Sequence, residues 1–271
     1  MARKIYKLLF VTAAVVCGVC LFGLYGCYQI YQKARAEYDS LGQQVVVMRV
    51  DEDALSADRS SAREINQENA ANQAESVESP PALLVDFDCL QAINKDAAAW
   101  IDFPGQGVSY PVAAGDDNEY YLNHTFQGRE NSAGCIFADY RNSGILMDDN
   151  TILYGHNMKN GSMFGMLNRY EKESHYKKYP YFDIYVPEGT YRCRIIAVCR
   201  TEADGENFPV KFGTAEERGT FVKKLMAGTP YEMASDWTLS GEPGPLVMLS
   251  TCVGKDYEHR MVILAQAYRW E

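Results

Sequence analysis

The pattern of apolar and polar positions divides the chain into three parts. Residues 8–28 form an uncharged apolar run, LLFVTAAVVCGVCLFGLYGCY. At a rise of about 1.5 Å per residue, a helix of this length can cross a hydrocarbon core of about 30 Å. Residues 29–82 are mostly polar, with an apolar patch at 45–50 and a Pro-Pro pair at 80–81. From residue 83 onward, short apolar runs alternate with Gly, Asn and Asp clusters, which is typical of a β domain.

The apolar run is predicted to be a retained transmembrane anchor. Arg3, Lys4 and Lys7 precede it, and positive charge favours the cytoplasmic side, so residues 1–7 are expected in the cytoplasm and the rest outside the cell. A cleaved signal peptide is the alternative, but the run exceeds the usual signal core and no convincing A-x-A cleavage site follows it.

The polar segment 29–82 is interpreted as an extracellular stalk. Its first part, YQKARAEYDSL, can continue the membrane helix. The stretch from Ser56 to Pro81 contains too little apolar surface to pack, so the sequence predicts disorder there. The catalytic domain is therefore expected to occupy residues 83–271.

Within 83–271 the sequence predicts a mainly β fold. Helical spacing of apolar residues from Phe87 to Ile101 predicts an amphipathic helix, and DDNEYYLNHTF and EERGTFVKKLMAGT predict two further helical pieces. Strands are expected in AGCIFADY, NTILYGH, YFDIYVPEG, TYRCRIIAVCR, GPLVMLSTC and RMVILAQAYRW. In TYRCRIIAVCR the odd positions from Tyr191 to Cys199 predict a single apolar face. Strands at this spacing favour an antiparallel barrel or sandwich.

Charge and cysteine usage narrow the possible functions. The chain has 271 residues and a net charge of -10, so it lacks the basic field that would argue for a nucleic-acid partner. Three of its eight cysteines, Cys17, Cys20 and Cys27, lie in the apolar run. The other five have irregular spacings, with no CxxC pair and no His at zinc-ligand spacing. Neither a metal nor a disulfide framework is expected.

Cys252 is the one cysteine placed where chemistry is usually done. It ends the apolar run PLVMLSTC and a polar loop follows it, so a sheet would hold its backbone beside a cleft. A packed structural cysteine is the alternative. Cys193 and Cys199 fall on the apolar strand face, and Cys89 and Cys135 fall in segments expected to pack.

His156 is the expected partner of this thiol, because a nucleophilic cysteine needs an imidazole or a cation beside it. It ends the strand NTILYGH as Cys252 ends its own strand, and two such strand ends can face each other. His124 and His175 lie in helical stretches that suit solvated or capping imidazoles. His259 ends the flexible loop after Cys252 and is a weaker candidate.

Arg260 is a candidate for stabilising an oxyanion. It begins the strand RMVILAQ, eight residues beyond Cys252, and could return across the loop to the same end of the sheet. The alternative is a surface ion pair with Asp256 or Glu258.

The order of several motifs resembles the class B sortases. The matching segments are WIDFPGQGVSYPV, DNEYYLNHTFQG, SAGCIFADYR, NTILYGHNMKNGSMFGML and PLVMLSTC, which cover the chain from about Asp86 to its C-terminus. The resemblance implies a closed sortase-type β-barrel of about eight strands with peripheral helices, preceded by the transmembrane helix. It implies no metal and no organic cofactor.

The resemblance also assigns roles to individual residues. It makes Cys252 the nucleophile, His156 its imidazole partner and Arg260 the group that steadies substrate and oxyanion. A groove for the sorting signal would be lined by Asn118, Leu122, Tyr154 and Ser250. Val253 follows the nucleophile where some members carry Glu, which weakens any substrate preference taken from the family.

The implied activity is that of a cysteine transpeptidase on the cell surface. Such an enzyme cleaves a C-terminal sorting signal after Thr, holds the acyl group as a thioester and transfers it to a peptidoglycan amine. The expected partners are surface proteins with an Asn-Pro-x-Thr-like or Ser-Pro-x-Thr-like signal, the peptidoglycan precursor and the membrane. A hydrolytic cysteine peptidase and an inactive sortase-like binding module remain alternatives.

Overall fold

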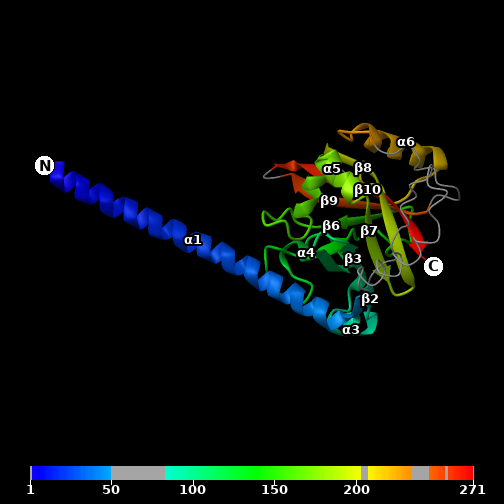
Figure 1. Cartoon of the computed structure of the whole chain (residues 1–271), viewed down its shortest axis with the longest axis horizontal. Helices are drawn as coiled ribbons and strands as arrows, with labels where there is room; N and C mark the ends of the chain where they lie inside the picture. The colour runs from blue at the N-terminus through cyan, green and yellow to red at the C-terminus, as the bar shows by residue number, and fades with distance from the viewer. Residues whose placement is uncertain (1, 50–82, 203–206, 233–243, 254–255, 271) are drawn as a thin grey trace, which may run out of the picture.

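The strands close into a barrel. The computed structural model describes residues 2–49, 83–202, 207–232, 244–253 and 256–270 (Figure 1). Eight strands follow one another around the barrel in the order β10-β8-β7-β3-β4-β5-β6-β9, which confirms the predicted closed barrel. Their bounds are β3 (Ala97–Phe103), β4 (Val108–Ala113), β5 (Ile136–Ala138), β6 (Asn150–Tyr154), β7 (Tyr181–Val186), β8 (Gly189–Glu202), β9 (Leu246–Val253) and β10 (Asp256–Trp270).

Two of the strand pairs are parallel. β4 pairs in parallel with β5, and β6 with β9, whereas the other neighbours in the barrel are antiparallel. In the β6–β9 pair, Tyr154 is the register partner of Ser250. Because parallel strands end at the same edge, β6 and β9 deliver the residues that follow them to one end of the barrel.

The helix predicted from Phe87 to Ile101 is only half correct. Helix α3 spans Phe87–Ile93 and is capped by Asp86, whose side chain accepts a hydrogen bond from the backbone N–H of Cys89. From Ala97 the chain becomes β3, in which Ala99, Trp100 and Ile101 are all buried. A strand buried on both faces has a continuous apolar run, and here that run imitates helical spacing.

The single apolar face predicted on β8 is also wrong in detail. A bulge separates the pairs Leu264↔Ala197 and Ala265↔Ile195. Cys193 and Ile195 therefore belong to the barrel interior, whereas Ala197 and Cys199 pack in a second cluster under α6 (Ala215–Ala227). A bulge inserts one residue into one strand and reverses the faces beyond it. Both cysteines are buried, as expected.

The remaining helical pieces lie outside the barrel. The segment DDNEYYLNHTF contributes only α4 (Tyr120–Asn123). Helix α6 forms as predicted and is capped by Thr214, whose side chain accepts a hydrogen bond from the N–H of Glu217. The 3-10 helix η1 (Gly165–Glu171) and α5 (Glu173–Lys178) follow β6. Figure 1 shows α6 against the side of the barrel that carries β8 and β10.

Helix α1 (Ala2–Val45) is long and projects from the barrel toward the N-terminus (Figure 1). The side chains described between Tyr6 and Gly26 are all exposed. Within the part of the chain that the structure describes, it is the one helix long and apolar enough to cross a membrane. The apolar run of the sequence is thus a candidate span, and the first part of the predicted stalk continues it as a helix.

The second half of α1 packs against the barrel. Ala34, Tyr38, Leu41 and Val45 recur at helical spacing and are buried. The chain then forms β1 (Val46–Arg49), which pairs with β2 (Leu83–Val85). The rest of the predicted stalk, 50–82, lies outside the described residues, so the division of the chain at residues 28 and 82 stays a prediction.

We expect Asp183→Asn to destabilise the barrel strongly. Arg192 donates to both carboxylate oxygens of Asp183, at 2.9 and 3.1 Å, and both side chains are buried. Removing one partner leaves an uncompensated buried charge, which costs about 3–5 kcal/mol. Thermal unfolding of the full chain measures the effect. Glu173→Gln is the control, because it removes an exposed ion pair with Lys177; equal losses in the two variants would contradict the prediction.

Candidate active site

A cavity of about 430 Å³ lies where β5, β6 and β9 end. It brings together six of the seven residues singled out from the sequence: Asn118, Leu122, Tyr154, His156, Ser250 and Arg260. The seventh, Cys252, has its backbone in β9, and its side chain lies outside what the structure describes. The other lining residues are Phe137, Asp139, Tyr140, Arg141, Gly155, Phe208 and Thr251.

The strand register positions Cys252 within this arrangement. In the parallel pair, Tyr154 is level with Ser250, and His156 and Cys252 each follow two residues later. In the antiparallel pair, Cys252 is the register partner of Arg260. Cross-strand partners share a face of the sheet, with Cα atoms about 4.5–5.5 Å apart. The backbone therefore places position 252 between the position of Arg260 and the segment that carries His156.

His156 leaves the end of β6 and is held by a backbone carbonyl. Its Nε2 lies 2.6 Å from the carbonyl oxygen of Leu122, and its ring is half-buried. A carbonyl only accepts hydrogen bonds, so Nε2 carries a proton and Nδ1 is the nitrogen left to exchange one. The preceding residue is glycine because a Cβ on Gly155 would lie 2.6 Å from Ile136 and 2.8 Å from Phe164.

The segment around α4 supplies the Leu122 carbonyl and one wall of the cavity. Asp117 begins it, since its carboxylate accepts hydrogen bonds from the N–H groups of Glu119 and Tyr120 at 2.8 Å. Those bonds lower the pKa of Asp117. Asn118 precedes the helix rather than lying in it, and its side-chain oxygen accepts a hydrogen bond from the N–H of Tyr140.

An ion pair between Asp139, which is buried, and Arg141, which is partly exposed, forms another part of the wall. It is absent from the candidates drawn from the sequence. Arg141 contacts both carboxylate oxygens of Asp139 at 2.9 and 2.7 Å, and the Tyr154 hydroxyl donates to the same carboxylate at 2.9 Å. Arg141 also donates to the carbonyl of Phe208. The signal was available: Asp139 lies at the end of the predicted strand AGCIFADY and Arg141 directly follows it, and His156 and Cys252 were singled out because they end their own strands.

This pairing governs the charges of the wall. Burial alone would raise the pKa of Asp139, but the hydrogen bonds from Arg141 outweigh it and the pKa is lowered. Burial, together with the neighbouring Asp139 carboxylate, raises the pKa of Tyr154. At neutral pH the wall therefore contains a carboxylate, a guanidinium and a neutral phenol that donates a hydrogen bond.

Burial disqualifies three other cysteines as nucleophiles at neutral pH. It raises the pKa of Cys135 to about 12 and that of Cys199 to about 11, and it raises the pKa of Cys193 as well. A thiol must ionise to attack, so these three are inert. Among the residues that the structure describes, no cluster of His, Cys, Asp and Glu gathers that could hold a metal ion.

The cavity also contains hydroxyl groups without protein partners. In the described chain, Ser250 Oγ and Thr251 Oγ1 are buried and make no hydrogen bond. An unpaired buried hydroxyl costs about 1–3 kcal/mol. Both residues line the cavity, so a polar ligand there can relieve this cost.

Comparison with known proteins decides the family. The chain is 36% identical over 176 residues to a sortase B of Listeria monocytogenes, a match that covers 64% of this chain and 70% of that protein. The chain belongs to the class B sortases. No protein-family model matches it. Its family makes it a sortase-type cysteine transpeptidase.

Solved sortase B structures share the fold. A Staphylococcus aureus sortase B–substrate complex superimposes with a TM-score of 0.66 at 24% identity, covering 89% of this chain and 98% of that chain. A sortase B complexed with triglycine gives a TM-score of 0.62 at 27% identity, covering 69% of this chain and 86% of that one. The barrel predicted from the motifs is therefore the sortase barrel.

We expect Asp139→Asn to lose stability in a pH-dependent way. Because the folded pKa of Asp139 lies below its unfolded value, the carboxylate stabilises the protein above the unfolded pKa and stops doing so as pH falls through the folded one. The deficit of the variant should be about 2 kcal/mol at pH 7, as for hydrogen bonds to a charged group, and should shrink below about pH 4. Melting temperatures measured from pH 3 to pH 7 test this, and a deficit independent of pH would contradict it.

Proposed function

We propose that this sortase cleaves a C-terminal sorting signal after its Thr and transfers the surface protein to a peptidoglycan amine. Cys252 is the nucleophile, His156 the acid and base, and Arg260 the group that stabilises the oxyanion. The observation that carries the proposal is the register of β9, which has His156 beyond one neighbouring strand and Arg260 directly across on the other.

The reaction proceeds in two acyl-transfer steps. The Cys252 thiolate attacks the Thr carbonyl carbon, and Arg260 stabilises the charge on the carbonyl oxygen. The C–N bond then breaks, the imidazolium of His156 gives a proton to the leaving nitrogen, and the acyl group remains as a thioester. An acceptor amine attacks the thioester, loses its proton to His156, and expels the Cys252 thiolate.

The leaving nitrogen must receive a proton, so one nitrogen of the His156 imidazole has to point toward it. Because Nε2 is committed to the Leu122 carbonyl, Nδ1 is the atom that gives and takes the proton in both steps. Nε2 orients the ring and Nδ1 reacts, as is usual for a catalytic imidazole.

The sorting signal would lie in the cavity of about 430 Å³. Asn118, Leu122, Tyr154 and Ser250 line it, and the unpaired Ser250 hydroxyl offers a hydrogen bond to the peptide. This lining combines apolar side chains with a few hydrogen-bonding groups. A signal of the Asn-Pro-x-Thr or Ser-Pro-x-Thr kind, which has both apolar and polar parts, can bind to such a surface.

The acceptor is an amine presented outside the membrane. One sortase B structure holds triglycine and another holds a substrate, and we extend both partner classes to this chain. Helix α1 would then anchor the enzyme through residues 8–28, with residues 1–7 in the cytoplasm and the barrel on the outer surface.

Cys252→Ala should lower the rate of peptide cleavage at least about a thousandfold, because no thioester can form. The rate is measured with the full chain in detergent micelles and a fluorogenic sorting peptide. Cys89→Ala is the matched control, since that half-buried thiol lies on α3. Undiminished cleavage by Cys252→Ala would refute the nucleophile assignment.

Arg260→Lys should lower the rate at least about tenfold, because an ammonium point charge replaces a planar fork of N–H donors. Arg200→Lys is the control: its side chain is exposed and pairs with Glu171. Turnover of Arg260→Lys close to that of the unmodified chain would remove this residue from the mechanism.

Adding triglycine to a panel of sorting peptides separates transfer from hydrolysis. A transpeptidase yields a peptide–triglycine adduct whose amount rises with amine concentration, and the panel identifies the preferred signal. Free acid as the sole product at every amine concentration would favour a hydrolytic peptidase. Binding of the peptides without any cleavage would favour an inactive module.

A further inference from the structure

Tyr38 on α1 is buried against the segment between α4 and β5, where its hydroxyl bonds to two backbone groups. Its hydroxyl donates to the carbonyl of Gly134 at 2.7 Å and accepts from the N–H of Phe126 at 3.2 Å. The side chain is 6% exposed. The bond to Gly134 joins residues 96 positions apart in the sequence. No step of the proposed reaction uses Tyr38.

Gly134 in turn lies against the catalytic imidazole. Its φ of +60° is in the left-handed region, and a Cβ there would lie 2.5 Å from the Tyr121 carbonyl, 2.8 Å from the Leu122 carbonyl and 3.0 Å from Cδ2 of His156. The Leu122 carbonyl is the group that holds Nε2. The Tyr38 hydroxyl is therefore bonded to a residue that packs on both His156 and its hydrogen-bond acceptor.

A second set of contacts leads from Tyr38 to the other side of His156. Its ring packs edge-on against Tyr110, with centroids 5.2 Å apart. The Tyr110 hydroxyl accepts from the N–H of Met163, which forms a β-bridge with Asn157. Phe164, next along the chain, donates its N–H to the carbonyl of His156 at 3.1 Å.

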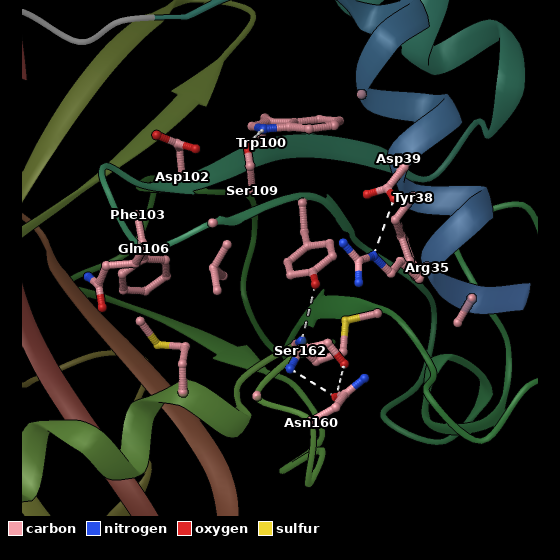
Figure 2. Close-up of a pocket in the computed structure, with 18 of the residues that line it drawn as sticks. Arg35, Tyr38, Asp39, Trp100, Asp102, Phe103, Gln106, Ser109, Asn160 and Ser162 are labelled. Atoms are coloured by element: carbon pink, nitrogen blue, oxygen red, sulfur yellow. Dashed lines mark hydrogen bonds and ion pairs between the residues drawn. The ribbon is translucent and has the colours of Figure 1, made fainter. Parts of the chain in front are cut away.

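Glu37, next to Tyr38, attaches the same turn of α1 to segment 126–134. Glu37 is buried, accepts from the N–H of Gln127 at 3.3 Å, and pairs with Arg129 at 3.4 Å. On the other side of Tyr38, α1 borders a cavity of about 1,030 Å³. Figure 2 shows Arg35, Tyr38 and Asp39 projecting from α1 beside this cavity, with Trp100 and Ser109 on the barrel. The turn at 37–38 therefore attaches α1 to segment 126–134 at the edge of this cavity.

We propose that Tyr38 is a positioning residue for catalysis, through which the helix that follows the membrane span holds the His156 imidazole in its reactive orientation. This inference rests on the proposed role of His156. Segment 126–134 transmits the contact by bonding to Tyr38 on one side and packing against His156 on the other. A small rotation of the ring would turn Nδ1 away from the leaving nitrogen, and displacements of about 1 Å can cost up to about a hundredfold in rate.

The test is Tyr38→Phe in the full chain in detergent micelles. The variant keeps the ring contact with Tyr110 and loses only the hydroxyl. We expect kcat to fall about tenfold. KM for the sorting peptide should change less than about twofold, because the substitution does not alter Tyr154 on β6 or Ser250 on β9, which line the proposed peptide site. The ¹⁵N chemical shifts of the His156 imidazole should change too, which a loss of stability alone would not cause in the folded protein.

Tyr31→Phe is the matched control. It removes a hydroxyl from the same helix, and among the residues that the structure describes none is hydrogen-bonded to that hydroxyl. It should behave as the unmodified chain does. Unchanged kcat and unchanged His156 signals in Tyr38→Phe would overturn the inference. Absence of cleavage by the unmodified chain would instead refute the proposed function, so the two failures are distinguishable.

A second pair of variants probes the link at Gly134. Gly134→Ala pushes a methyl group toward the Leu122 carbonyl and His156, whereas Gly107→Ala has a similar positive φ of +68° with nothing within 4 Å. We expect the kcat loss in Gly134→Ala only. If Tyr38→Phe proves unfolded at the assay temperature, Glu37→Gln replaces it, and a normal kcat in that variant overturns the inference.

Discussion

The candidate active site depends on the hydrogen-bonded register of β9 between β6 and β10. A strand has a side-chain period of two, so a slip by one residue exchanges its faces. Here such a slip would bring Thr251 to the position of Ser250 and separate Cys252 from the level of His156. Because β9 is paired along both edges, neither neighbour can shift without breaking a ladder. Backbone pairing alone therefore sets the relative positions of Cys252, His156 and Arg260, the residues proposed to react.

The second half of α1 is attached to the rest of the protein by a different kind of interaction. Apolar burial of Leu41 and Val45 attaches its end, but the turn at Glu37 and Tyr38 bonds to backbone and charged groups of segment 126–134. Polar contacts of this kind are directional, so they define the helix orientation more closely than an apolar stripe would. The helix is consequently a structural part of the end of the barrel that carries the candidate site, as well as a connection to the N-terminal run.

Much of this architecture could be predicted from the sequence, for identifiable reasons. Strand ends marked by polar residues led to His156 and Cys252, and turn residues delimited most of the strands. The helix from Phe87 to Ile101 failed because a strand buried on both faces has no alternation to reveal it. The bulge in β8 has no local signal, since it depends on pairing with β10. Tyr38 lies in a polar segment whose composition is that of a stalk, and its partners are 88 and 96 residues away.

The short pair β1–β2 has a consequence for protein engineering. Arg49 and Leu83 are register partners, so the chain leaves the barrel surface and returns to it at a single point. The pairing of β1 with β2 fixes where both ends of the joining segment lie, and the entropy of closing a loop grows only slowly with its length. Lengthening the connection between these strands therefore adds only a small entropic cost to folding, which makes it the position to choose for an affinity tag or a reporter domain.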